Sequence, residues 1–91
     1  MFDIWKFILG LDDDLKKELG RERLNTLILI ASYADSNGYS NITVNAIADK
    51  FNICKKEAAR KVNDLLKFTY KGESIIFFSK RGYHINLRLQ K

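Results

Sequence analysis

The spacing of hydrophobic residues changes along the chain, and each change predicts a different element. Between residues 21 and 68 the apolar positions recur every three to four residues, which is typical of helices that bury one face. From residue 74 onward the period falls to two, which is typical of half-buried strands. The pattern therefore predicts, in order, a helix over 21–34, a short strand over 39–43, helices over 43–51 and 55–68, and strands over 74–78 and 83–89.

Turn-forming residues separate these segments. The sequence Asp-Ser-Asn-Gly at 35–38 ends the first long helix, and Thr43 is a suitable N-cap for the next one. Asn52 makes a tight break between the second and third helices. Gly82 supplies the positive φ that a hairpin between the two strands requires.

The first twenty residues differ from the rest because their apolar positions show no single face. Residues 2–11 fit helical spacing, Asp12 to Asp14 can cap a following helix, and Gly20 either ends or kinks it. Such a segment either covers the core of its own chain or forms a subunit interface. We expect an interface, and hence a homodimer, formed by Phe2, Trp5, Phe7 and Ile8.

Composition and charge narrow the class of protein. The chain has 91 residues, 46% of them hydrophobic and 30% charged, which predicts one globular domain over 1–91, with an extension at 1–20 and a core at 21–91. Residues 1–35 carry a net charge of −2 and residues 36–91 a net charge of +7. The basic part suggests a polyanionic partner, although a lysine-rich solvated surface has the same balance. No apolar run is long enough for a membrane span.

Residue types that usually act in catalysis or metal binding are scarce. Cys54 is the single cysteine, which excludes an internal disulfide and fits a cytoplasmic location, and His84 is the single histidine. We expect no zinc or other metal, no cofactor and no small-molecule substrate. Without a nucleophile–histidine motif, a glycine-rich loop after a strand or paired carboxylates, the sequence predicts no catalytic residues and no enzyme activity.

Residues 21–89 resemble the winged helix-turn-helix superfamily, and residues 44–65 carry the resemblance most sharply. Ala48 matches the small residue where the first helix crosses the second. Asn52 replaces the glycine usual in the left-handed turn, and an aliphatic residue, Ile53, follows it. The sequence differs from the family at Cys54, where a serine or threonine cap is usual. The apolar anchors of the recognition helix correspond to Ala58, Val62 and Leu65.

The resemblance implies an α+β, mainly α fold, in which a three-helix core and a C-terminal β-hairpin wing follow an N-terminal apolar helical extension. It also implies a protein that binds double-stranded DNA with its third helix in the major groove. Arg60 would read guanine, Ala59 would touch a thymine methyl group, and Lys55 and Lys56 would lie close to base edges and phosphates. The remaining residues would contact phosphates or the neighbouring groove. The implied DNA-binding residues are Thr43, Asn45, Lys55, Lys56, Ala59, Arg60, Lys61, Lys80 and Arg81.

The sequence, interpreted in this way, leaves several functions open. The first is a sequence-specific transcriptional regulator, and the second is a DNA-binding protein that marks a plasmid or phage partition or replication site. A third is a protein–protein interaction module that binds no DNA, which the basic third helix and hairpin argue against. An RNA reader is disfavoured because no aromatic pair is evident on an exposed strand, although one face of residues 75–78 is unassigned.

Overall fold

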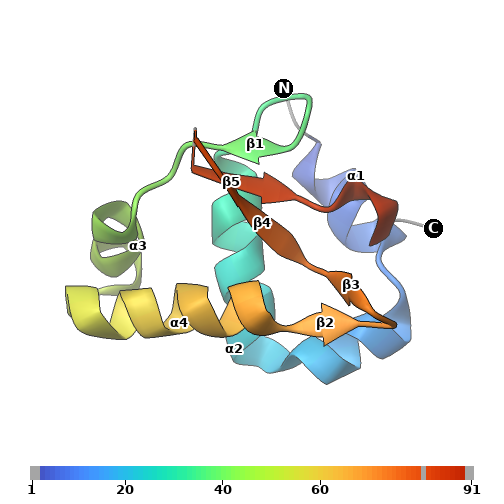
Figure 1. Ribbon diagram of the computed structural model, residues 1–91, viewed down its shortest axis with the longest axis horizontal. Coiled ribbons are helices and arrows are strands. Elements are labelled where there is room, and N and C mark those ends of the chain that lie inside the picture. The colour runs from blue at the N-terminus through green and yellow to red at the C-terminus, as the bar shows by residue number, and fades with distance from the viewer. Residues whose placement is uncertain (1–2, 81, 90–91) are drawn as a thin grey trace.

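Helices from the first two-thirds of the chain pack against a small antiparallel sheet formed mainly by the last third (Figure 1). The computed structural model describes residues 3–80 and 82–89, and over these the fold is α+β and mainly helical. Its elements are α1 (Ile4–Gly10), α2 (Asp13–Ser32), β1 (Tyr39–Ser40), α3 (Val44–Phe51), α4 (Lys55–Lys67), β2 (Thr69–Tyr70), β3 (Glu73–Ser74), β4 (Ile76–Ser79), β5 (Gly82–Ile85) and a 3₁₀ turn at Leu87–Leu89. This order is compatible with a winged helix.

The helix starts follow the capping rules that the sequence predicts. The Asp12 side chain accepts a hydrogen bond from the Asp14 amide at 3.0 Å, and Thr43 Oγ1 accepts one from the Ala46 amide at 3.1 Å. At the start of α4, by contrast, Cys54 makes no side-chain cap. The predicted caps at Asp12 and Thr43 are therefore confirmed.

Gly20 breaks α2 into two helical segments. Its φ of 76° and ψ of 169° lie outside the helical region, in a conformation that few residues other than glycine adopt. The chain can change direction here while both segments still reach the same core, because Leu19 and Leu27 are each buried.

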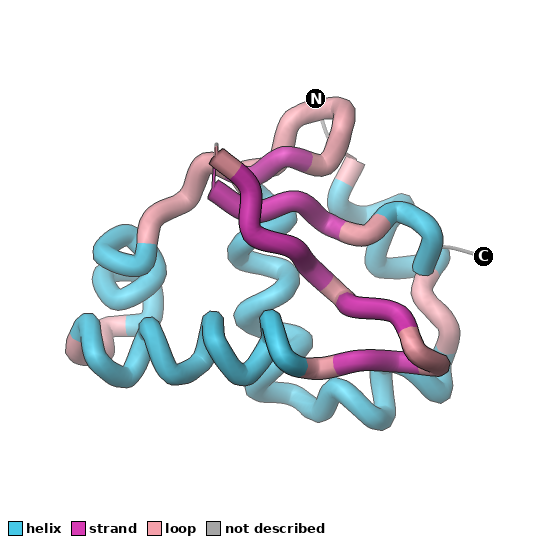
Figure 2. Tube along the Cα trace, viewed as in Figure 1, coloured by secondary structure: helices cyan, strands magenta, loops and turns pink. Residues whose placement is uncertain are grey.

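The sheet joins two distant parts of the chain. Its strand order is β1-β5-β4, all antiparallel, and Ser79 pairs with Gly82 at the end of the β4–β5 hairpin. A Cβ atom on Gly82 would lie 2.3 Å from the Ser40 carbonyl oxygen, so only glycine allows β1 to approach so closely. Figure 2 shows these strands as a band crossing the molecule, with helices beside and behind it.

The last strand is shorter than the sequence pattern predicts. We expected a strand over residues 83–89, but β5 ends at Ile85 and the chain turns into the 3₁₀ segment. The buried Asn86 side chain explains the turn, because its Nδ2 donates to the Ser74 carbonyl at 2.8 Å and its Oδ1 accepts from the Arg88 amide at 3.1 Å. A further hairpin, β2–β3, was not predicted; Lys71 and Gly72 form its turn with φ angles of 52° and 81°.

The N-terminal segment contributes directly to the core, which corrects part of the expected interface. Phe7 is completely buried and Ile8 is partly buried against the same cluster, because α1 packs on α2. Trp5 and Leu9 remain 75% and 77% exposed. Phe2 lies outside the described residues. Phe7 is therefore a core residue of its own chain rather than an interface residue.

Candidate nucleic-acid interface

The turn between α3 and α4 has the geometry expected of a helix-turn-helix. Asn52 adopts the left-handed conformation, with φ 55° and ψ 48°, and its amide donates to the Asp49 carbonyl at 3.2 Å. The Ile53 amide then donates to the Ala48 carbonyl at 3.0 Å, which ends α3. Ala48 is buried, and α3 packs against α4. The second helix of the pair is thus held in a fixed direction relative to the first.

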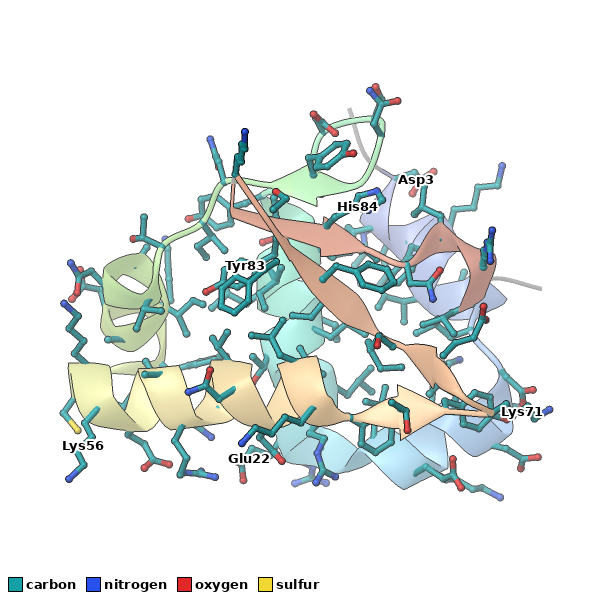
Figure 3. All side chains as sticks on the ribbon, in the orientation of Figure 1. Asp3, Glu22, Lys56, Lys71, Tyr83 and His84 are labelled. Carbon is teal, nitrogen blue, oxygen red and sulfur yellow. The ribbon has the colours of Figure 1, made fainter. Side chains whose placement is uncertain are left out.

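α4 separates an apolar face from a basic face. Ala58, Val62 and Leu65 are buried in the core, as predicted. On the opposite side the helix exposes Lys56, Arg60, Asn63 and Lys67, with Ala59 half-buried at the margin of an open groove that these residues line. Figure 3 shows Lys56 pointing away from the body of the protein at the outer end of α4.

Arg60, the predicted base-reading residue, is held by carboxylates of its own chain. Its Nε donates to Glu57 Oε1 at 2.8 Å, and its Nη2 donates to Glu22 Oε1 of α2 at 2.7 Å. The Lys61 ammonium lies 2.9 Å from the same Glu22 oxygen. We call Glu22, Glu57, Arg60 and Lys61 the ion-pair cluster.

The charges in the ion-pair cluster shift the pKa values of its members. Hydrogen bonds from Lys61 and then Arg60 lower the pKa of Glu22, and Arg60 likewise lowers the pKa of Glu57. The two carboxylates, Glu57 first, raise the pKa of Arg60. The Nε and one terminal nitrogen of the guanidinium are therefore occupied within the chain, and a guanine base would have to compete with Glu22 and Glu57 for them.

A second ion pair joins the same two helices. Arg23 Nε donates to Asp64 Oδ2 at 3.0 Å, and the Arg23 guanidinium lies 4.9 Å from the centroid of the Phe68 ring. The sequence pattern indicates no role for Glu22, Arg23 or Asp64. Their partners lie 38 and 41 residues away, so no local spacing signals these contacts.

The lysines outside these ion pairs form the accessible part of the basic surface. Lys55, Lys56, Lys67 and Lys80 are all exposed, and none makes a salt bridge within residues 3–80 and 82–89. Lys61 differs, since its side chain is only 18% exposed and is paired with Glu22. The predicted basic surface is thus carried by lysines rather than by Arg60 and Lys61.

The predicted phosphate-binding residues lie near the same end of the molecule. In Figure 1, α3 lies between the start of α4 and the tip of the β4–β5 hairpin. Thr43 and Asn45 are exposed at the start of α3, although Thr43 Oγ1 also serves as the helix cap. The position of Gly82 against Ser40 and Asn41 brings the hairpin close to the loop that leads into α3. Arg81 lies outside the described residues.

Comparison with known proteins does not assign the chain to a family. No family model, no curated protein and no solved structure matches the chain. Within the described part of the chain, no three histidine, cysteine, aspartate or glutamate side chains are grouped so that they could hold a metal ion. None of the described helices combines the length and the apolar character needed to cross a membrane.

Proposed function

We propose that the protein binds double-stranded DNA as a winged helix-turn-helix, with α4 in the major groove. The observation that carries the proposal is the exposed face of α4, where Lys56 and Lys67 flank Asn63 without an acidic partner among the described residues. This face follows directly after the left-handed turn at Asn52. In helix-turn-helix proteins the helix after the turn enters the major groove.

The exposed positions of α4 differ in what they can recognise. Asn63 carries an amide that can pair with adenine N6 and N7, and Lys56 can donate to guanine O6 or N7. Ala59 is small enough to let the helix approach a thymine methyl group. Since Arg60 is bound to Glu22 and Glu57, we assign base reading to Lys56 and Asn63 in the first place, with Arg60 joining only when DNA displaces those carboxylates.

Phosphate contacts would surround this central helix. Thr43 and Asn45 lie at the start of α3, where backbone amides and the helix dipole favour an anion. Lys55 precedes the base-reading positions, and Lys80 follows β4 at the turn of the hairpin, which would act as the wing. Arg81 is next in the sequence and is proposed as a further phosphate contact. Contacts of this kind fix the register of a protein on DNA without reading sequence.

In biological terms we propose a cytoplasmic, homodimeric transcriptional regulator without catalytic activity. A role at a plasmid or phage partition or replication site uses the same surface, and mapping the bound sites to promoters or to origin repeats separates the two roles. A module that binds only other proteins would leave the exposed lysines of α4 without a function.

Duplex binding measured by fluorescence anisotropy at several salt concentrations tests the proposal. If about five basic groups neutralise phosphates, the slope of log affinity against log salt should be about −4 to −5. Lys55→Ala removes an exposed lysine placed among the phosphate contacts, so it should weaken binding and reduce the steepness of this slope by about 1. Lys6→Ala removes an exposed lysine from α1, far along the chain from α4, and should change neither quantity. The absence of duplex binding at about 100 mM salt, or equal effects of the two variants, would contradict the proposal.

A further inference from the structure

The outward face of the three-stranded sheet carries a row of rings that the sequence pattern did not indicate. Tyr39 of β1 lies opposite His84 of β5, and His84 lies opposite Phe77 of β4. Residues directly opposite each other in a sheet point to the same face. We call Tyr39, His84 and Phe77 the ring row.

The ring row is partly ordered by contacts within the chain. Tyr39 and His84 are stacked, with ring centroids 4.2 Å apart and planes inclined by 20°. His84 Nε2 also lies 3.2 Å from the Asn37 carbonyl oxygen, which fixes the orientation of the imidazole ring. Phe77 is less constrained, since it lies 6.2 Å from His84 with a tilt of 31° and is 42% exposed.

A hollow of about 490 Å³ opens beside the Phe77 end of the row. Phe77 and His84 line it on the sheet, and Leu87, Arg88 and Glu73 line it from the neighbouring segments. Leu87 is itself 38% exposed, so the hollow combines apolar contact with space for a planar ring. Its charged lining residues are Arg88 and Glu73, whose guanidinium and carboxylate are 3.7 Å apart.

Two exposed cations beside the row, Arg88 and Lys80, suit a polyanion better than an apolar peptide. The Arg88 side chain is 84% exposed and its ion pair with Glu73 is long, so the guanidinium is accessible at the rim of the hollow. Lys80 follows directly after Ser79 at the other end of β4 and is also exposed. The Asp35 carboxylate near Tyr39 already accepts bonds from the Asn37 and Tyr39 amides. Glu73 is the one described acidic side chain in the wall of the hollow, and it can accept from an exocyclic amino group of a base.

We propose that the ring row and the adjoining hollow bind an unpaired base of single-stranded nucleic acid, by stacking on Phe77 and His84 and by phosphate contacts to Arg88 and Lys80. Aromatic side chains on a sheet, combined with cations that follow the backbone, are the features that single-strand binding requires. The rings and Arg88 belong to different elements from the basic face of α4, and Lys80 is the one residue that this surface shares with the proposed duplex interface.

Binding of a fluorescently labelled oligodeoxyadenylate about ten nucleotides long tests the proposal, with an abasic strand of equal length as the charge-matched probe. The abasic strand should bind about tenfold more weakly, because it keeps the phosphates but offers no ring to stack. Phe77→Leu should weaken binding of the oligodeoxyadenylate by about tenfold and leave duplex binding unchanged, whereas Phe77→Tyr should retain it.

Phe78→Leu provides the matched control. Phe78 is 70% exposed but lies on the other face of β4, opposite Tyr83, so this variant should bind the oligodeoxyadenylate normally. If Phe77→Leu does not fold, as judged by circular dichroism, Arg88→Gln should still reduce the steepness of the single-strand salt slope by about 0.7. Equal binding of the intact and abasic strands, or equal losses in Phe77→Leu and Phe78→Leu, would overturn the proposal. A change in light scattering on Phe77 substitution without a change in single-strand binding would overturn it too, and would indicate a self-association face.

Discussion

Asn52 determines the angle between α3 and α4 through a backbone conformation that most residues disfavour. Replacing it with alanine should lower the free energy of unfolding by about 1–2 kcal/mol, because a Cβ-bearing residue without a local hydrogen-bonding side chain is disfavoured in the left-handed region. Asn52→Gly should be neutral or slightly stabilising. Chemical denaturation measures both effects.

Asn45→Ala is the matched control for this prediction. Asn45 is also exposed but lies inside α3, where alanine is the better helix former, so this variant should not lose stability. Equal losses at positions 45 and 52 would show that the left-handed conformation does not contribute the expected stability.

Single residues were predictable where the physical rule is local. The roles of Thr43 and Asn52 follow from side-chain capping and from the left-handed turn, each of which involves atoms within four residues. Arg60 was not predictable in this way. Its helical position correctly placed it on the exposed face of α4, but its partner Glu22 belongs to a helix 38 residues earlier, and no local spacing encodes that approach.

At the scale of elements, helices were predicted better than strands. The apolar spacing in α4 involves only residues of that helix, so it identifies the buried face without knowledge of the partner elements. The observed helix ends one residue before the expected boundary at Phe68. Strands depend on partners elsewhere in the chain. The alternation over residues 83–89 suggested one strand, but the bond from Asn86 to Ser74 ends the ladder early. A period of two therefore indicated the start of β5 and not its end.

The ion-pair cluster between α2 and α4 should make stability depend on acid pH. The pKa of Glu22 is lower in the folded chain than its ordinary value of 4.5, so folding favours the ionised carboxylate. Its contribution is fully present above pH 4.5 and is lost as the pH falls below 4.5 toward the lowered pKa. Glu22→Gln should therefore lose less stability than the wild-type protein between neutral pH and pH values below 4.5, as measured by denaturation at each pH.

Glu18→Gln is the appropriate comparison, because Glu18 is an exposed glutamate of α2 without an ion pair among the described residues. This variant should keep the acid sensitivity of the wild-type protein. If the two variants have the same pH profile, the contacts of Glu22 with Arg60 and Lys61 do not contribute to stability in solution.

At the scale of the whole molecule, the N-terminal segment shows how far a hydrophobic pattern can be interpreted. Residues 2–11 are too apolar to display one face, so the sequence could not separate core from interface positions. The structure separates them, with Phe7 and Leu11 in the core and Trp5 and Leu9 in solvent. Deletion of residues 1–11 would remove two completely or almost completely buried side chains, so we expect it to unfold the protein rather than to leave a folded monomer.

Trp5, from the expected interface, and Leu9, which the sequence did not single out, are now the basis for proposing a homodimer. They are four residues apart in α1, which places them on the same side of the helix, and both are more than 70% exposed. A second copy would cover this apolar pair and give two DNA-binding helices related by a twofold axis, suited to half-sites about one helical turn apart. Light scattering should therefore report a dimer. The double variant Trp5→Ser, Leu9→Ser should be a folded monomer with weaker binding to a palindromic duplex.

Two further measurements separate self-association from loss of folding. Lys6→Ser changes an exposed residue between the two apolar positions and should remain dimeric, whereas Phe7→Ser should unfold the chain because Phe7 is completely buried. Trp5 is the only tryptophan, so its fluorescence should shift to longer wavelength as dilution returns it to water. A monomer at high micromolar concentration, with emission independent of dilution, would contradict the dimer. It would also mean that one copy of α4 must supply all major-groove contacts.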